Sequence, residues 1–350
     1  MPQEIELNNR KIGDNHPIYF VAEMSANHNQ DLDRALEIVE AASEAGADAI
    51  KIQTYKPGNM TLNMDTEEFT IGDGTDWAGQ NLYELYKEAY TPWEWHEPIR
   101  DKALELGIDF FSTAFSKEAV EYLDELGVPI HKTASFELVD LPLIRAMANT
   151  GKPLILSTGM GTLGEIEEAV RTARDAGCEQ IALLHCVSSY PADPQQMNLN
   201  TIENLQVTFD VVPGLSDHTL SSEVVLGSVP IGAKIIEKHF TLSRDVDTPD
   251  SNFSLEPDEF ESMVESVRLL EDAQGEVHYG ITEAEQNSTV FRRSLFDVEE
   301  IKEGEELTEK NIRRIRPGNG LKPKYYNSVI GRTASRDLKR GTPLQWEHVT

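Results

Sequence analysis

The sequence predicts an α/β protein: an eight-stranded TIM (β/α)8 barrel followed by a small, mostly β C-terminal domain. The main observation is alternation, because short apolar, β-branched runs recur along the chain and each precedes a stretch with helical periodicity. About eight such units occupy about 275 residues, the number and length typical of this barrel. A doubly wound open sheet is the alternative, but it would normally have fewer strands and a single phosphate-binding Gly turn after the first.

The expected strands follow one another at regular intervals. They cover residues 18–23, 49–53, 109–113, 130–133, 154–157, 180–185, 212–216 and 234–239. Amphipathic helices are predicted over residues 31–45, after the first strand, and over residues 257–273, after the last. Each of the intervening strands is also followed by a helical stretch, so the pattern is that of repeated βα units.

Two polar stretches interrupt this pattern. Residues 56–79, after the second strand, are rich in Gly, Asn, Thr and Asp, and long loops of this kind in a compact domain are usually functional or mobile. Extra helices are expected behind this loop, over residues 81–89 and 91–107. The second polar stretch covers residues 241–257, after the last strand.

We expect three segments: a barrel domain over residues 1–278, a linker over 279–290 and the small β domain over 291–350. The small domain contains short strand-like pieces and the turn motifs EGEE, RPGNG and KRGT. Between positions 311 and 340 it carries nine basic residues and one acidic residue. Such a patch should face something negative, either the barrel, a partner subunit's barrel or an anionic substrate; a solvated basic face is the alternative.

The whole chain is strongly acidic, with 61 Asp and Glu against 31 Lys and Arg and a formal charge of −30. This balance argues against a protein that binds nucleic acid or an anionic membrane surface. A salt-rich cytoplasm would explain the excess, and ordinary bacterial acidity is the alternative. Two cysteines, Cys178 and Cys186, form neither a disulfide framework nor a metal motif and should be buried. With neither a signal-like apolar start nor an apolar run of about 18 residues, a soluble cytoplasmic protein is expected.

The active site of a TIM barrel lies at the carboxyl ends of its strands, and here all eight ends are polar. A single charged residue there could belong to a satisfied buried ion pair. Charges at many consecutive ends are hard to explain by packing, because burying them is costly. The polar residues at or near these ends are Glu23, Lys51, Gln53, Thr113, Lys132, Ser135, Glu137, Ser157, His185, Ser188, Tyr190, Ser216, His218, Glu237, Lys238 and His239.

Their chemistry separates them into groups with different roles. Lys51 and Lys132 suit a phosphate and a carboxylate, together with hydroxyl groups at nearby strand ends. The hydroxyls come from Thr113, Ser135, Ser157 and Ser216. His218 and His239 could share one divalent metal, although two histidines alone are a weak signal. Glu23 is the best candidate for acid–base work, and the alternative role for it is a charge partner for a lysine.

Several blocks that contain these residues resemble the sialic acid synthases, which condense phosphoenolpyruvate with an amino-sugar aldehyde. The barrel blocks are VAEMSANHNQDLDRA, AGADAIKIQTY, IHKTASFE, LILSTGMGTLGEIEEAV, PGLSDHT and IIEKHFTL, and FRRSL and IRPGNGL resemble the family's C-terminal antifreeze-like (SAF) domain. The resemblance covers nearly the whole chain. It implies a domain-swapped homodimer in which the SAF domain of one subunit caps the barrel of the other, which would explain the basic patch.

The resemblance also implies roles for individual residues. Glu23 would be the catalytic acid–base, and His218 and His239 would hold a divalent metal, manganese first with magnesium or cobalt as substitutes. Phosphoenolpyruvate would be bound by Lys51, Thr113, Lys132, Ser135, Ser157 and Ser216. The sugar pocket would be lined by Gln53, Glu137, Tyr190 and Asp250, with Arg316 from the partner subunit. Ser188 stands where many of these enzymes have Asn, in the block CVSSYP, so its place in the phosphoenolpyruvate site is less firmly implied.

The blocks WAGQNLYELYKEAYTPWEWH, DSNFSLEPDEF and GLKPKYY are similar to the pseudaminic acid synthase branch. The acceptor would then be 2,4-diacetamido-2,4,6-trideoxy-L-altrose. Five aromatic residues add surface near the long loop that would suit such a sugar, or they pack on the barrel exterior: Tyr83, Tyr86, Tyr90, Trp93 and Trp95.

Several alternatives remain open. The acceptor could be a manno-configured sugar, as in the neuraminic and legionaminic acid synthases. The chain could also be a 3-deoxy aldose-phosphate synthase, against which the SAF domain argues, or a non-catalytic carbohydrate-binding barrel. A Schiff-base aldolase acting through Lys51 or Lys132 is a further alternative.

Overall fold

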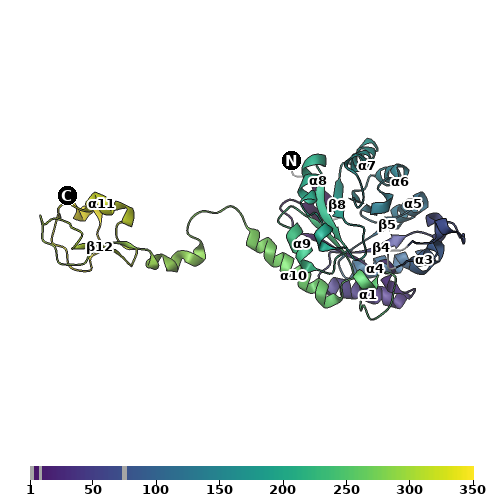
Figure 1. Ribbon diagram of the computed structural model, residues 1–350, viewed down its shortest axis with the longest axis horizontal. Coiled ribbons are helices and arrows are strands. Elements are labelled where there is room, and N and C mark those ends of the chain that lie inside the picture. The colour runs from purple at the N-terminus through teal and green to yellow at the C-terminus, as the bar shows by residue number, and fades with distance from the viewer. Residues whose placement is uncertain (1–3, 8–9, 73–76) are drawn as a thin grey trace. The chain divides into compact units, whose positions relative to one another are not determined.

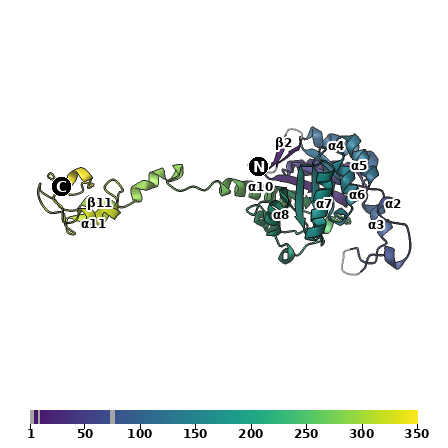
Figure 2. The same ribbon diagram turned by 90° about the horizontal axis from the view of Figure 1, so that it is seen from above.

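The computed structural model describes residues 4–7, 10–72 and 77–350. The chain forms two compact units, Met1–Gly275 and Glu276–Thr350, and each is described by itself. In the first unit the strands form the centre and the helices surround them (Figure 1). Figure 2 shows the same elements from above.

The first unit is a closed barrel of eight parallel strands, which confirms the predicted fold. The strands are β3 (Tyr19–Glu23), β4 (Ala49–Thr54), β5 (Asp109–Ala114), β6 (His131–Thr133), β7 (Leu154–Ser157), β8 (Ile181–Cys186), β9 (Val212–Asp217) and β10 (Ile235–His239). They neighbour one another in chain order, and β10 closes the barrel on β3. Almost every strand residue is buried, as expected for a parallel sheet covered on both faces.

The main helices of this unit alternate with the strands. They are α1 (Leu32–Glu44), α4 (His96–Glu105), α5 (Lys117–Leu126), α6 (Leu141–Ala148), α7 (Leu163–Asp175), α8 (Thr201–Phe209), α9 (Ser222–Ser228) and α10 (Pro257–Gln274). Local sequence explains their starts: the Asp31 side chain caps α1, and Thr162 and Glu165 form a capping box at α7. Their apolar faces pack against the outside of the strands and complete one continuous core.

The predicted long loop after β4 contains short elements that its polar composition did not indicate. It begins with α2 (Pro57–Met60), includes a 3₁₀ helix at Glu67–Phe69 and leads into α3 (Leu82–Ala89). Residues 73–76 of this loop lie outside the described residues. The second polar loop, after β10, contains a 3₁₀ helix at Ser251–Phe253.

An N-terminal hairpin precedes the barrel and was not predicted. Its strands are β1 (Glu4–Leu7) and β2 (Arg10–Gly13), which pair antiparallel. The backbone N–H of Glu6 donates a hydrogen bond of 2.7 Å to Oε1 of Gln180, the residue before β8. The hairpin therefore lies at the amino ends of the barrel strands, away from the polar strand ends.

The second unit is small and has its own apolar core, which includes Leu295, Ile312 and Leu344. Strands β11 (Ser294–Asp297) and β12 (Ile312–Ile315) pair antiparallel, and most of the rest is turns and isolated bridges, as predicted for a mostly β domain. The helical elements are 3₁₀ turns at Glu283–Phe291, Pro323–Tyr325 and Trp346–His348, and the short α11 (Tyr326–Val329).

All nine basic residues of the predicted patch in this unit are exposed. Among the residues that the structure describes, no helix of either unit is both long and apolar enough to span a membrane.

Candidate active site

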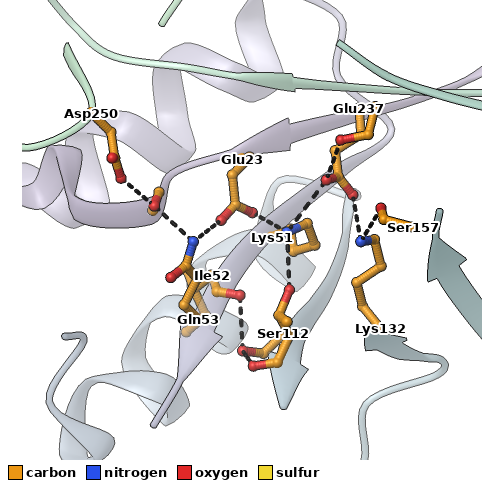
Figure 3. A network of polar contacts seen from close by, with 12 residues as sticks. Glu23, Lys51, Ile52, Gln53, Ser112, Lys132, Ser157, Glu237 and Asp250 are labelled. Atoms are coloured by element: carbon orange, nitrogen blue, oxygen red, sulfur yellow. Dashed lines mark hydrogen bonds and ion pairs between the residues drawn. The ribbon is translucent and has the colours of Figure 1, made fainter. Parts of the chain in front are cut away.

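A row of buried charges crosses the carboxyl ends of the barrel strands. Nζ of Lys51 lies 2.6 Å from Oε2 of Glu23 and 3.6 Å from Oε1 of Glu237. Oε2 of Glu237 lies 3.8 Å from Nζ of Lys132. Figure 3 shows the four side chains converging from different strands. Each of these side chains is at most 6% exposed, so two lysines and two glutamates share one dry site.

Strand register explains why these residues meet. Glu23 is the register partner of Lys51 on β4 and of His239 on β10, and Thr113 on β5 pairs with Lys132 on β6. Alternate side chains of a strand point to the same face, so Lys51 and Gln53 both face the barrel interior. The same alternation places Glu237 on the face that carries His239. The prediction placed Glu237 at a polar strand end but gave it no role. Its position two residues before His239 already indicated that the two side chains share one face of the strand.

The four charges influence one another's pKa values. Burial raises the pKa of Glu23, and the charge of Glu237 adds to this, although Lys51 opposes it. For Glu237, burial is outweighed by Lys132 and Lys51, so its pKa is lowered. Burial lowers the pKa of Lys132, whereas the two glutamates overcome burial and raise that of Lys51. Two carboxyl groups whose pKa values are displaced in opposite directions are typical of acid–base sites.

Hydroxyl groups accompany the lysines as predicted. Nζ of Lys51 donates a hydrogen bond of 3.1 Å to Oγ1 of Thr113, and Nζ of Lys132 donates one of 2.7 Å to Oγ of Ser157. Oγ of Ser216 donates to Oε1 of Glu237 at 3.1 Å. These groups are all buried. The cluster therefore combines cationic and hydroxyl donors, the groups that a phosphate or a carboxylate requires.

Ser135 and Ser188 meet at a tight turn after β7. The N–H of Gly159 donates a hydrogen bond of 3.2 Å to Oγ of Ser135. A Cβ atom at position 159 would lie 2.3 Å from Oγ of Ser188 and 2.7 Å from Oγ of Ser135, so only glycine fits without displacing them.

The two predicted metal ligands lie side by side, with ring centres 5.3 Å apart. Nδ1 of His218 is 3.0 Å from the carbonyl oxygen of Val187, an arrangement that commonly orients a ligating histidine. Nδ1 of His239 is buried without a hydrogen-bond partner in the described part of the chain. Burial, and then the charge of His218, hold the pKa of His239 well below its usual range. A lowered pKa favours the neutral ring, the form that coordinates a metal.

Tyr190 and Cys186 lie next to these histidines. The Tyr190 ring centre is 4.3 Å from that of His218, and Sγ of Cys186 is 3.8 Å from Nδ1 of His218. Burial raises the pKa of the Cys186 thiol, but His218 outweighs it and the net shift is downward. Both cysteines are buried, as expected, and Cys186 contacts the site. Within the described residues, no group of three or more His, Cys, Asp and Glu side chains could hold a metal by itself.

A pocket of about 330 Å³ opens beside the charge row, lined by residues that include Gln53, Glu137, Tyr190, His239 and Asp250. Nε2 of Gln53 donates hydrogen bonds to Oε1 of Glu23 at 3.1 Å and to Oγ of Ser25 at 2.8 Å. Oγ of Ser25 in turn bonds to Asp250. The four predicted sugar-site residues of the barrel therefore line one pocket and connect to the charge row.

Burial raises the pKa of Glu137 to about 7. Its Oε2 atom has no hydrogen-bond partner among the described residues, so this carboxyl group is available to a ligand in the pocket.

Three of the five aromatic residues near the long loop can be assigned to one or other of the predicted locations. Tyr86 lines the pocket. Trp93 stacks on Tyr122 at 4.7 Å between ring centres, and Trp95 packs edge-on against His28 at 5.6 Å. Arg316 belongs to the second unit, where its guanidinium lies 6.0 Å from the centre of the Phe291 ring.

Comparison with known proteins assigns the chain to a family. The NeuB family model matches residues 38–279, and the SAF domain model matches residues 292–350. The chain therefore belongs to the NeuB family and carries a C-terminal SAF domain, as the resemblance implied.

Individual relatives agree with this assignment. The chain is 45% identical to pseudaminic acid synthase of Helicobacter pylori, over 95% of this chain and 98% of that one. It is 34% identical to N,N'-diacetyllegionaminic acid synthase of Legionella pneumophila, over 97% and 99% of the two chains. Among solved structures, N-acetylneuraminic acid synthetase of Leptospira borgpetersenii is 33% identical with a TM-score of 0.73, covering 82% of this chain and 95% of that one.

Proposed function

We propose that this protein is a pseudaminic acid synthase, which condenses phosphoenolpyruvate with 2,4-diacetamido-2,4,6-trideoxy-L-altrose to give pseudaminic acid and phosphate. The observation that carries the proposal is the buried row of Glu23, Lys51, Glu237 and Lys132 at the strand ends, beside a sugar-sized pocket. The 45% identity to a pseudaminic acid synthase supports the choice of sugar. Turnover of a manno-configured acceptor, the alternative substrate, is one of the outcomes that the test below distinguishes.

In this proposal Lys51 and Lys132 bind the phosphate and carboxylate groups of phosphoenolpyruvate. The hydroxyl groups around them add short, directional donors: Thr113, Ser135, Ser157, Ser188 and Ser216. The dry surroundings strengthen each of these interactions. The acceptor binds next to them, against Gln53, Glu137, Tyr190 and Asp250.

The reaction then needs one carbon–carbon bond and one carbon–oxygen cleavage. C3 of phosphoenolpyruvate attacks the aldehyde carbon of the open-chain sugar, and the aldehyde oxygen takes a proton. Water adds at C2, and the resulting hemiketal phosphate loses phosphate by cleavage of its C2–O bond. Glu23 moves the protons, because its raised pKa lets it both carry and accept one. The pocket holds both reactants in attack geometry.

His218 and His239 fit a divalent metal in this scheme. They offer two imidazole rings from neighbouring strand ends. Nδ1 of His218 contacts the Val187 carbonyl, and Nδ1 of His239 has no hydrogen-bond partner among the described residues. Water and substrate oxygens would complete the ligand set. A bound metal ion, manganese in this proposal with magnesium or cobalt as substitutes, would act as a Lewis acid on the aldehyde oxygen.

The proposal extends to assembly and location. A domain-swapped homodimer would bring the SAF domain of one subunit over the barrel of the other, with Arg316 reaching the sugar. The exposed basic residues of the second unit and the overall charge of −30 support such a pairing. We place the enzyme in the cytoplasm.

The test is phosphate release from phosphoenolpyruvate with manganese, at low and high salt, with three acceptors in parallel. These are the diacetamido-trideoxy-altrose, the diacetamido-trideoxy-mannose and N-acetylmannosamine. A higher kcat/KM for the altrose sugar than for either manno sugar supports the proposal. Preference for a manno sugar overturns the substrate assignment but keeps the chemistry, and no turnover with any acceptor overturns the catalytic role.

A further inference from the structure

We infer that one face of helix α3 is a specificity surface, which selects acceptor sugars whose substituents are methyl and acetamido groups rather than hydroxyl groups. This inference rests on the proposed function and concerns the outer part of the same pocket. Four residues of α3 line the pocket: Leu82, Leu85, Tyr86 and Ala89. We call them the α3 stripe.

The spacing of the α3 stripe is that of a core-facing helix. Its members lie at positions i, i+3, i+4 and i+7, which share one side of an α-helix. Such an apolar side normally packs against the protein core. No residue of α3 is fully buried, however. Tyr86 packs edge-on against Tyr55, with ring centres 5.7 Å apart, and all four residues of the stripe also line the pocket. The apolar surface is thus left for an occupant of the pocket.

Other apolar side chains extend this surface around the pocket. Met60 from α2, Ile71 from the loop and Phe115 after β5 add further apolar side chains to the lining of the pocket. The polar end contains Gln53 and Asp250, which bond to Ser25 and lead to Glu23. A ligand whose reacting end lies at Glu23 would therefore place its more distant substituents against the α3 stripe.

Specific contacts hold α3 in this position. The Asn81 side chain accepts hydrogen bonds from the N–H groups of Tyr83 and Glu84, and its amide donates to the carbonyl of Met64 at 2.8 Å. Just before the helix, the N–H of Ile71 donates to the carbonyl of Gln80 at 2.9 Å, and the N–H of Gly79 donates to the carbonyl of Ile71 at 2.8 Å. These contacts fix the position of the α3 stripe in the lining of the pocket.

The chemistry of this apolar lining favours a 6-deoxy sugar with two acetamido groups. Methyl groups gain from contact with leucine and aromatic carbon, whereas a hydroxyl group at the same place would lose its hydrogen bonds to water. N-acetylmannosamine has hydroxyl groups at C4 and C6 and only one acetamido group. Both diacetamido-trideoxy sugars, altrose and mannose, have a C6 methyl group and two acetamido methyl groups, so the stripe selects substituents and not configuration.

The test compares kcat/KM for the diacetamido-trideoxy-altrose and for N-acetylmannosamine in wild type and Leu85→Asn, which is close to isosteric. We expect the ratio of the two values to fall about 10- to 100-fold, mostly through the deoxy sugar, with the KM for phosphoenolpyruvate unchanged. Leu85→Met keeps an apolar surface and should keep the ratio. Leu62→Asn is the matched control, because Leu62 lies in the loop between α2 and α3 and is 62% exposed.

The outcomes separate this inference from the proposed function. If wild type turns over the sugars but Leu85→Asn leaves the ratio unchanged, the α3 stripe is not a specificity surface and the proposed function stands. If Leu85→Asn does not fold, Leu82→Asn provides the same comparison. If wild type releases no phosphate at all, the proposed function fails. Calorimetric binding of the two sugars then decides the inference, which is overturned if Leu85→Asn binds both as wild type does.

Discussion

Nζ of Lys51 lies 2.6 Å from Oε2 of Glu23, and both side chains are almost completely buried at the mouth of the barrel. A buried ion pair of this kind stabilises a fold little, because both charges lose their hydration. Its position at the strand ends and its link to Glu237 give it a chemical purpose instead. In the proposed function, Lys51 binds the anionic substrate and Glu23 exchanges protons with it during the reaction.

A substitution at Gly159 should weaken phosphoenolpyruvate binding. In Gly159→Ala the new methyl group would displace the Ser135 and Ser188 hydroxyls, so we expect the Kd, measured by calorimetry, to rise at least about tenfold. Gly164→Ala is the matched control, because a Cβ there meets open space. An unchanged Kd in Gly159→Ala would show that the turn after β7 does not bind the substrate.

Breaking the buried pair of Lys238 and Asp217 should destabilise the barrel next to the histidines. Nζ of Lys238 lies 2.8 Å from Oδ2 of Asp217, whose Oδ1 accepts the Thr219 N–H at 2.9 Å. Lys238→Met leaves an unpaired buried carboxylate and should lower the free energy of unfolding by about 3–5 kcal/mol. The double variant with Asp217→Asn should recover much of this loss in denaturant unfolding.

The control for this prediction is Lys117→Met, which removes an exposed ion pair with Glu121. It should change the free energy of unfolding by less than about 1 kcal/mol. Equal losses in Lys117→Met and Lys238→Met would contradict the role given to the buried pair.

Asp297 should make the second unit less stable as the pH rises. The residue is fully buried, neither carboxylate oxygen has a hydrogen-bond partner among the described residues, and burial raises its pKa from 3.8 to about 7. Between these values the folded state binds more protons than the unfolded state, so stability is lost as the pH rises through about 7. Asp297→Asn removes the charge and should stabilise the unit by about 1–4 kcal/mol at pH 8.5.

The measurement is denaturant unfolding of the full chain at pH 5.5 and 8.5, followed by a probe in the second unit such as Trp346 fluorescence. Wild type should lose stability between the two pH values, and Asp297→Asn should lose less. The same pH dependence in both proteins would rule out ionisation of Asp297 as its cause.

Much of the barrel could be predicted from the sequence because parallel strands buried on both faces appear as continuous apolar runs. Each of the eight predicted runs overlaps an observed strand, with ends that differ by at most one residue. The hairpin of β1 and β2 was missed because four-residue strands of mixed polarity have no such pattern. The short helices between residues 57 and 69 were missed for a similar reason, since their sequence is polar and their order depends on tertiary contacts.

Those residues of the candidate site could be predicted whose side chains, at the end of a strand, indicate a chemical role. Glu23, Lys51 and Lys132 could be placed together, because the register of neighbouring strands brings their ends into one layer. Glu237 could have been added to this group, because it lies two residues before His239 on the same strand. The contact of Cys186 with His218 depends on side-chain direction, which only the structure supplies. The α3 stripe has the spacing of an ordinary core-packing helix, so its exposure to the pocket could not be recognised from the sequence.

The most direct test of the account is the turnover of Glu23→Gln. The amide keeps the size and the hydrogen bond to Gln53 but cannot move a proton, so kcat should fall about 10²- to 10⁴-fold. Binding of phosphoenolpyruvate, measured by calorimetry, should remain close to that of wild type because the lysines are still present. Glu37→Gln, at an exposed position on α1, should have wild-type kcat. Wild-type turnover in Glu23→Gln would contradict the central claim that Glu23 is the acid–base of this site.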